Sequence, residues 1–165
     1  AIEYFDNIDI DFGKYEILGI EKKCDFEING YKFTGYIDLL LREKDTGKIV
    51  LIDHKSSKYP YGKKGKLLKS EKDKFQQYKR QLYLYSIQVF NEYGVFPDRI
   101  GWNYFGDRKW DFLDFNKEDY EEAKKWAIDT LEEVRNTSEF PPTVDFYYCH
   151  NLCKFRNSYC EYKNY

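Results

Sequence analysis

The sequence lacks several features that mark common classes of protein. It contains no methionine, not even at position 1, as expected of a piece cut from a longer protein. No stretch approaches the ~20 consecutive apolar residues that a membrane-spanning helix requires. No segment resembles a secretory signal peptide and no internal repeat is visible. We therefore predict a cytoplasmic protein without membrane contact.

Positive charge is concentrated in one segment, although the whole chain has a net charge of only −2. Residues 54–80 hold nine lysines and one arginine against Glu71 and Asp73, a net of +8. Such a segment can be a solvated loop or a surface that binds an anionic polymer. Because it directly follows a strand that ends in charged residues, the second interpretation is favoured.

Hydrophobic periodicity predicts a single α/β domain over residues 1–165. Alternating apolar and polar residues predict strands, and Asn29-Gly30 predicts a tight turn between the first two. A capping box of Ser70 and Asp73 is expected to start one helix, and Asn116 another. The predicted order is strands at 16–28, 31–42 and 48–55, a helix at 71–93, strands at 98–105 and 109–115, a helix after 116, and a loop-like, cysteine-bearing tail at 143–165.

Acidic residues interrupt two apolar strands, in GYIDLLL (35–41) and IVLIDHKSSK (49–58). Strand alternation puts Asp53 and Lys55 on one face and His54 on the other, and the hairpin can bring Asp38 beside Asp53. Two converging carboxylates are costly unless a divalent cation holds them. Lys55 could then hold water or stabilise developing negative charge. An exposed ion pair is the simpler interpretation of D-x-K alone, but the linked features favour a metal site.

These two motifs, together with Gln81-Leu82-Tyr83-Leu84-Tyr85, resemble those of the PD-(D/E)XK nuclease superfamily over roughly residues 16–105. The RecB-like exonuclease branch, with the AddB-type and CRISPR-associated nucleases, is the most similar. The resemblance implies a restriction-endonuclease-like mixed sheet flanked by helices. It implies that Asp38, Asp53 and the His54 backbone carbonyl bind Mg²⁺ or Mn²⁺, and that Lys55 is the catalytic lysine. It also implies that Gln81 and Tyr85 line the active site.

The first strand and the residues before it fit the family pattern less closely. Glu21 resembles an acid often found on the family's first strand, although a surface glutamate is an equal interpretation; Glu16 is a weaker substitute. The family usually has a helix before this strand. Residues 1–15 show no helical pattern, so we expect this helix to be absent from the chain.

DNA is the predicted partner, with a helicase or recombination partner also compatible with this branch. We expect Tyr59 and Tyr61 to stack on bases. The side chains expected to contact the DNA backbone are Lys58, Lys63, Lys64, Lys66 and Arg80. The choice between single and double strands stays open.

Three of the four cysteines, Cys149, Cys153 and Cys160, lie within twelve residues of one another. Such clustering suggests metal binding in a cytoplasmic protein. The trio resembles, in looser spacing, the cysteines that hold an iron–sulfur cluster in some RecB-like nucleases, and His150 could join them around zinc. Partly buried thiols without metal are the other interpretation. Cys24 reads as a small buried apolar residue.

The leading hypothesis is a metal-dependent DNA nuclease, of exonuclease type, that acts in recombination, repair or phage DNA processing. Two alternatives stay open. One is a nucleic-acid-binding module on the same fold that has lost catalysis. The other is an unrelated sheet domain whose C-terminal cysteines bind a structural zinc ion.

Overall fold

The computed structural model describes residues 11–140, 142, 144–155 and 160–161. The chain divides into two compact units, Ala1–Thr130 and Leu131–Tyr165, which we describe separately. Residues 1–10 lie outside the described part, so the predicted absence of a helix over residues 1–15 falls mostly outside it too. None of the helices that the structure describes combines the length and apolarity needed to cross a membrane.

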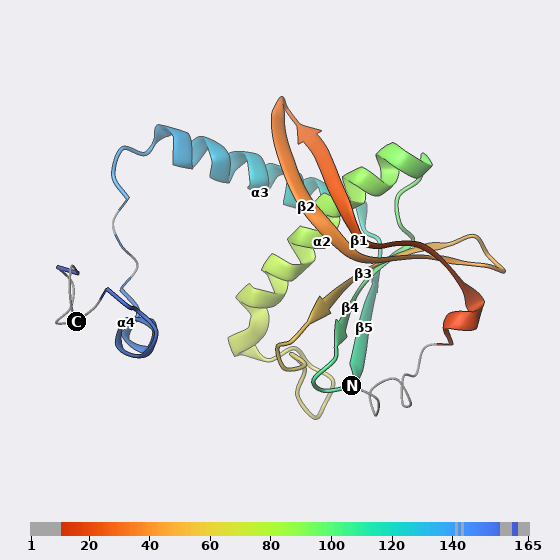
Figure 1. The fold of residues 1–165 in the computed structure, drawn as a ribbon, viewed down its shortest axis with the longest axis horizontal. Helices are drawn as coiled ribbons and strands as arrows, with labels where there is room; N and C mark the ends of the chain where they lie inside the picture. The colour runs from red at the N-terminus through yellow and green to blue at the C-terminus, as the bar shows by residue number, and fades with distance from the viewer. Residues whose placement is uncertain (1–10, 141, 143, 156–159, 162–165) are drawn as a thin grey trace. The chain divides into compact units, whose positions relative to one another are not determined.

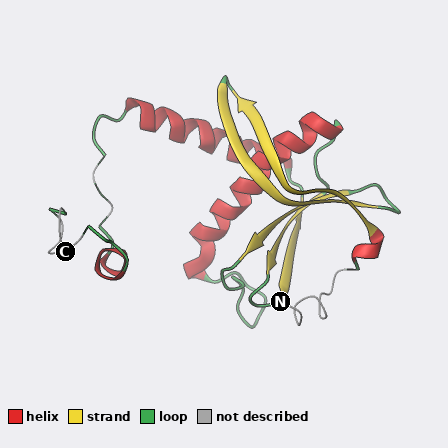
Figure 2. Cartoon of the chain, viewed as in Figure 1, coloured by secondary structure: helices red, strands yellow, loops and turns green. Residues whose placement is uncertain are grey.

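The first unit is built on one five-stranded sheet in the order β1-β2-β3-β4-β5 (Figures 1 and 2). The strands are β1 (Tyr15–Ile28), β2 (Tyr31–Glu43), β3 (Ile49–Lys55), β4 (Arg99–Tyr104) and β5 (Lys109–Asp114). Neighbouring strands are antiparallel except β3 and β4, which are parallel. A parallel pair needs a long crossover, and a helix lies between these two strands in the sequence. The predicted mixed α/β sheet is confirmed.

Two long helices accompany the sheet, α2 (Lys72–Tyr93) and α3 (Lys117–Asn136). Helix α2 ends at Gly94, whose φ of 74° is easily adopted only by glycine. Helix α3 begins as predicted, with the Asn116 side chain accepting hydrogen bonds from the next turn. The predicted capping box at Ser70 is wrong. Lys69–Glu71 form a 3₁₀ turn, and the residue before α2 makes no side-chain cap.

The two faces of the sheet carry different cores. On one face, Leu51 packs with Trp102 and with Leu82 and Tyr83 of α2, all at most 1% exposed, in a cluster that α3 joins through Ala123. The other face holds a smaller cluster of strand residues, Leu39, Leu41, Val50 and Ile52, against which Tyr15, Trp110 and Phe112 pack. Alternation along β3 therefore directs Asp53 and Lys55 toward the helix-covered face.

Strands β1 and β2 bend sharply where the hairpin leaves the sheet (Figure 1). Ile37 and Leu40 of β2 pack in the same cluster although they are three residues apart, so alternation breaks between them. On β1 the register shifts between Ile17 and Gly19. Glu21, which lies between the paired residues Ile20 and Lys22, has a positive φ of 48°. The bend places Asp38 next to the end of β3.

The second unit contains a short helix, α4 (Phe146–Asn151), which begins at Asp145. The side chain of Asp145 accepts a hydrogen bond from the backbone N–H of Tyr148 at 2.8 Å. The prediction that the tail is loop-like throughout is therefore wrong for these six residues.

Candidate active site

Asp53 and Lys55 form an ion pair at the end of β3. Lys55 Nζ lies 2.6 Å from Asp53 Oδ2, and only 13% of the lysine side chain and 8% of the aspartate side chain are exposed. The pair is thus largely buried on the helix-covered face. This differs from the exposed ion pair that was the simpler interpretation of the D-x-K motif alone.

Helix α2 extends this pair into a chain of polar contacts. Lys55 Nζ donates a hydrogen bond to Gln81 Oε1 at 3.1 Å, and Gln81 Nε2 donates one to the Tyr85 hydroxyl at 3.3 Å. Residues 81 and 85 lie one turn apart on the same helix face. Gly35 of β2 makes room for this chain, because a Cβ there would lie 2.5 Å from the Tyr85 hydroxyl oxygen.

Asp38 reaches the same strand end from β2. Asp38 and Asp53 each lie one residue beyond the paired residues Leu39 and Ile52. The backbone N–H of His54 donates a hydrogen bond to Asp38 Oδ2 at 2.6 Å. The structure therefore brings together Asp38, Asp53, Lys55, Gln81 and Tyr85, which we call the candidate cluster.

The pKa of Asp53 lies above its ordinary value. Burial is the largest cause, because it disfavours the charged form, and the negative charge of Asp38 acts in the same direction. The hydrogen bond and the positive charge of Lys55 lower the pKa but do not cancel the rise. A buried carboxylate in this position would gain from a further positive charge.

The donor chemistry of these two carboxylates fits a hard divalent cation. Mg²⁺ prefers oxygen, and it is commonly held by one or two carboxylates with water and substrate phosphates completing its shell. Among the residues that the structure describes, no group of three or more His, Cys, Asp or Glu side chains could hold a metal. A further protein ligand would then be a backbone carbonyl, such as that of His54.

The His54 side chain lies apart from the candidate cluster, on the other face of the sheet. Its Nδ1 is 3.1 Å from the amide nitrogen of Asn103, and its ring meets the edge of Trp110 at 6.5 Å. Glu21 is exposed at the bend of β1 and joins no three-membered acidic group within the described part. Glu16 forms an ion pair with Arg42 at 3.1 Å.

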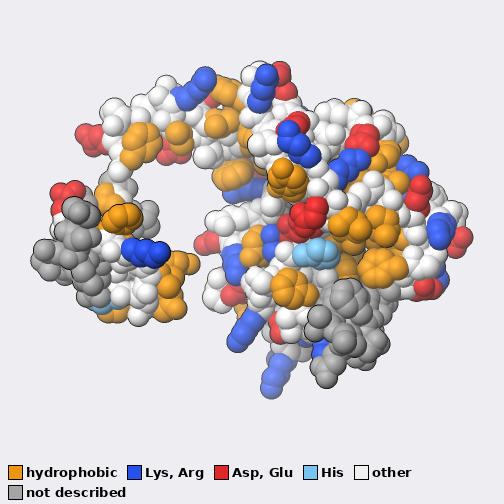
Figure 3. Space-filling view, viewed as in Figure 1, with side chains coloured by type: hydrophobic (Ala, Val, Ile, Leu, Met, Phe, Trp, Pro, Cys, Tyr) orange, Lys and Arg blue, Asp and Glu red, His pale blue; other side chains and the backbone are white. Residues whose placement is uncertain are grey.

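Residues 58–68, which we call the basic loop, form a small ordered hairpin. Tyr61 pairs with Leu67, and backbone hydrogen bonds join Gly62 to Lys66 and Leu68 to Pro60. Figure 3 shows Lys and Arg side chains protruding at this end of the sheet. The exposed lysines of the loop, none of which forms an ion pair with a described residue, are Lys58, Lys63, Lys64 and Lys66.

The turn and strand that follow β4 anchor the basic loop. The Tyr61 hydroxyl donates a hydrogen bond to Asp111 Oδ2 at 2.8 Å, and the Tyr59 backbone N–H donates one to Asp107 Oδ2 at 2.6 Å. The Tyr59 ring packs edge-on against Tyr104. Both tyrosines predicted to stack on bases thus already have protein contacts that fix the loop.

Arg80 lies between α2 and α3 rather than on the basic loop. Its guanidinium grips the Glu122 carboxylate through Nε and a terminal nitrogen, and lies 4.8 Å from the centre of the Trp126 ring. The Arg80 guanidinium, which the sequence predicts to contact DNA, is therefore already engaged by a contact within the protein.

The C-terminal cysteines belong to the second unit. Cys149, Cys153 and Cys160 are free thiols and do not gather into a metal-binding group with other described side chains. The described part of the tail therefore gives no support to the predicted iron–sulfur or zinc site. Cys24, in contrast, is 0% exposed in the core, and burial raises the pKa of its thiol to about 12.

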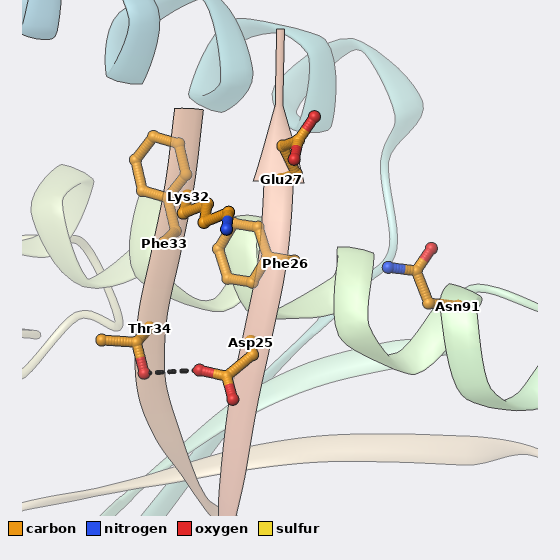
Figure 4. A pocket seen from close by; sticks show the side chains of 7 residues that line it. All are labelled: Asp25, Phe26, Glu27, Lys32, Phe33, Thr34 and Asn91. Carbon is orange, nitrogen blue, oxygen red and sulfur yellow. Dashed lines mark hydrogen bonds between the residues drawn. The ribbon is translucent and has the colours of Figure 1, made fainter. Parts of the chain in front are cut away.

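A shallow hollow beside the β1–β2 hairpin contains none of the predicted site residues (Figure 4). In it the Thr34 hydroxyl donates a hydrogen bond to Asp25 at 2.7 Å. The residues that line it are Asp25, Phe26, Glu27, Lys32, Phe33, Thr34 and Asn91. Because this hollow holds none of the residues that the motifs single out, we place the candidate active site at the end of β3.

Two residues that contact the candidate cluster or the basic loop are not marked by the sequence. Tyr78 places its ring beneath the Lys55 ammonium, and Asp111 holds the basic loop. Periodicity marks Tyr78 only as part of the apolar stripe of α2. No local pattern marks Asp111, because its partner Tyr61 lies 50 residues away in the sequence.

Comparison with known proteins agrees with this geometry. A family model described as the PD-(D/E)XK nuclease superfamily matches residues 2–165, nearly the whole chain. A search among curated proteins finds no match to this sequence.

Proposed function

The chain belongs to the PD-(D/E)XK nuclease superfamily, and from this membership and the candidate cluster we propose that it is a divalent-metal-dependent DNA nuclease. The observation that carries the proposal is the continuous contact from Asp53 through Lys55 to Gln81. A buried lysine held between a carboxylate and an amide has a fixed position, which is what a group acting on a scissile phosphate needs.

Each residue of the candidate cluster has a proposed role. Asp38 and Asp53, with the His54 carbonyl, would hold Mg²⁺ or Mn²⁺. When bound, such an ion supplies Lewis-acid stabilisation of the phosphodiester and lowers the pKa of a bound water. Lys55 donates hydrogen bonds to the attacking water or to a phosphate oxygen. Gln81 orients Lys55 and is in turn held by Tyr85.

The exposed lysines of the basic loop are proposed to contact the phosphates of the DNA strand that enters the site. Tyr59 and Tyr61 are proposed to support this loop and to offer their remaining ring surface to bases. Exonuclease action, the RecB-like branch, a cytoplasmic location and a helicase or recombination partner are also part of the proposal. The cytoplasmic location comes from the sequence prediction, and the other three rest on the motif resemblance alone.

The direct test is cleavage of labelled DNA in Mg²⁺ or Mn²⁺ by the wild type and by Lys55→Ala. We expect Lys55→Ala to lose cleavage while its affinity for DNA, measured by anisotropy with EDTA present, is largely kept. Lys32→Ala is a matched control, because Lys32 is exposed and lies six residues from Asp38 along β2, about 20 Å at ~3.3 Å per residue.

Three outcomes separate the hypotheses. Equal cleavage by the wild type and Lys55→Ala would remove Lys55 from the mechanism. Wild-type protein that binds DNA without cleaving it in either metal would favour a binding module that has lost catalysis. Wild-type protein that neither binds nor cleaves DNA would contradict the proposed function altogether.

A further inference from the structure

The aromatic ring of Tyr78 lies directly against the Lys55 ammonium. Lys55 Nζ is 3.9 Å from the centre of the ring, well within the distance of a cation–π contact. Tyr78 comes three residues before Gln81 and seven before Tyr85, so all three lie on one stripe of α2. The side chain of Lys55 is therefore enclosed by a carboxylate, an amide and an aromatic face.

We propose that Tyr78 is a positioning residue for Lys55, which holds the ammonium at the reacting phosphate through the face of its ring. This inference rests on the proposed nuclease function and adds a residue outside the motifs that carry the resemblance. Tyr78 does not need to touch the substrate, because it acts through the lysine.

The need for such a residue follows from the double role of Asp53. Its Oδ2 pairs with Lys55 at 2.6 Å, yet the same carboxylate is the proposed ligand of the divalent cation. An oxygen shared with a cation holds an ammonium less strongly, since the two positive charges repel each other. An aromatic face attracts an ammonium but is no ligand for Mg²⁺. Gln81 and Tyr78 would then keep Lys55 in place.

The aromatic ring of Tyr78, rather than its hydroxyl group, makes the contact that holds Lys55. The Tyr78 hydroxyl lies 3.4 Å from Ser57 Oγ, at the long limit of a hydrogen bond. The only other cation near the ring among the described residues is Lys74, at 5.7 Å and on the exposed first turns of α2. Tyr78→Phe should therefore behave like the wild type, whereas Tyr78→Leu should not.

The test measures cleavage of labelled DNA in Mg²⁺ under single-turnover conditions, at a temperature where every variant is folded. For Tyr78→Leu we expect the maximal single-turnover rate to fall about tenfold, the loss that a desolvated cation–π contact can cause. The protein concentration that gives half of this rate should change less than about twofold. Tyr78→Phe should stay within about twofold of the wild type. Tyr93→Leu is the matched control, because Tyr93 makes a cation–π contact with Lys22 at the far end of α2.

A double-mutant cycle separates positioning from packing. If Tyr78 acts through Lys55, adding Tyr78→Leu to Lys55→Ala should lower the residual rate no further. Pentafluorophenylalanine at position 78 keeps the ring shape but reverses its quadrupole, so it should lower the single-turnover rate even if Tyr78→Leu folds poorly.

Four results would overturn the proposal: wild-type activity in Tyr78→Leu, an equal loss in Tyr78→Phe, an undiminished loss in the Lys55→Ala background, or full activity with the fluorinated ring. In each of these cases, loss of most cleavage in Lys55→Ala would leave the proposed function standing. A wild type without metal-dependent cleavage would instead remove both.

Discussion

Lys55 and the lysines of the basic loop are only a few residues apart in the sequence, but they occupy opposite environments. Lys55 is 13% exposed and is enclosed by Asp53, Gln81 and Tyr78. Lys63, Lys64 and Lys66 are exposed at the tip of a hairpin, where no described acid pairs with them. The same residue type thus occurs in two environments, as a largely buried charge held by three side chains and as charges exposed to solvent.

This contrast has energetic consequences. A buried charge keeps its full electrostatic effect and cannot be replaced by a neighbour, so one substitution should abolish its function. Exposed charges are screened by salt and act additively, so each substitution should weaken binding in small steps. The comparison predicts which variants lose cleavage, which lose affinity and which lose only stability.

The largest effect is expected from Asp53→Asn. The cleavage rate should fall about 10³-fold, which is the size of loss seen when an enzyme loses one group that stabilises charge in the transition state. The melting temperature should not fall, because burial raises the pKa of Asp53 and the ionised form is costly in the folded protein. Single-turnover cleavage and thermal melts at pH 7 check both. A destabilised variant with normal cleavage would make Asp53 a structural residue.

Neutralising the loop tip should give a smaller and different effect. In the triple variant Lys63→Ala, Lys64→Ala, Lys66→Ala we expect DNA affinity to fall about tenfold at moderate salt. The slope of the logarithm of the DNA-binding constant against the logarithm of salt concentration should become shallower by up to about 2–3, if each lysine neutralises one phosphate. The cleavage rate of bound DNA should be unchanged. A lost rate with unchanged affinity would contradict the assigned role of the loop.

Tyr61→Phe tests the anchor of the basic loop. It removes the hydroxyl that donates to Asp111 and should lower the free energy of unfolding by about 1–2 kcal/mol, because Asp111 loses its donor. DNA affinity should fall a few-fold, less than in the triple lysine variant. Urea unfolding measures the change in the free energy of unfolding, and fluorescence anisotropy measures the change in DNA affinity. Tyr36→Phe, at an exposed position, is the control.

The smallest effect is a pH dependence carried by Asp111. Burial, as the largest cause, raises its pKa above the ordinary value of 3.8 against the opposing hydrogen bond from Tyr61. The folded state then holds a proton that the unfolded state releases, so stability falls as pH rises from about 3.8 through the raised folded pKa. The melting temperatures of the wild type and Asp111→Asn should converge at low pH, and the wild type should be the less stable of the two at neutral pH. A difference in melting temperature that stays constant with pH would contradict this.

Much of the fold could be predicted from the sequence, because its periodicities are strong. The observed strand and helix bounds lie within two residues of the predicted ones where the pattern is regular, as in β3 and α2. Helix α4 was missed because its six residues form fewer than two turns, too few for a helical period to be recognised. The 3₁₀ turn at Lys69–Glu71 was missed because it displaces Ser70 from the cap that its sequence pattern suggests.

The contacts of the candidate cluster were predictable only in part. Alternation is local, so it indicates that Asp53 and Lys55 share a face, and the hairpin indicates that Asp38 is their neighbour. The cation–π contact of Tyr78 depends on how α2 packs across the sheet, which no local pattern contains. The engagement of Arg80 by Glu122 likewise joins residues 42 positions apart.

The central claim is that Asp38 and Asp53 hold one divalent cation together, and titration with Mn²⁺ tests it without any substrate. Calorimetry of the wild type should show one Mn²⁺-binding site. Asp38→Asn and Asp53→Asn should each lower the affinity of this site for Mn²⁺, and the double variant should abolish binding. If Mn²⁺ binds the wild type no more tightly than it binds the double variant, the two aspartates do not form a metal site and the account is contradicted.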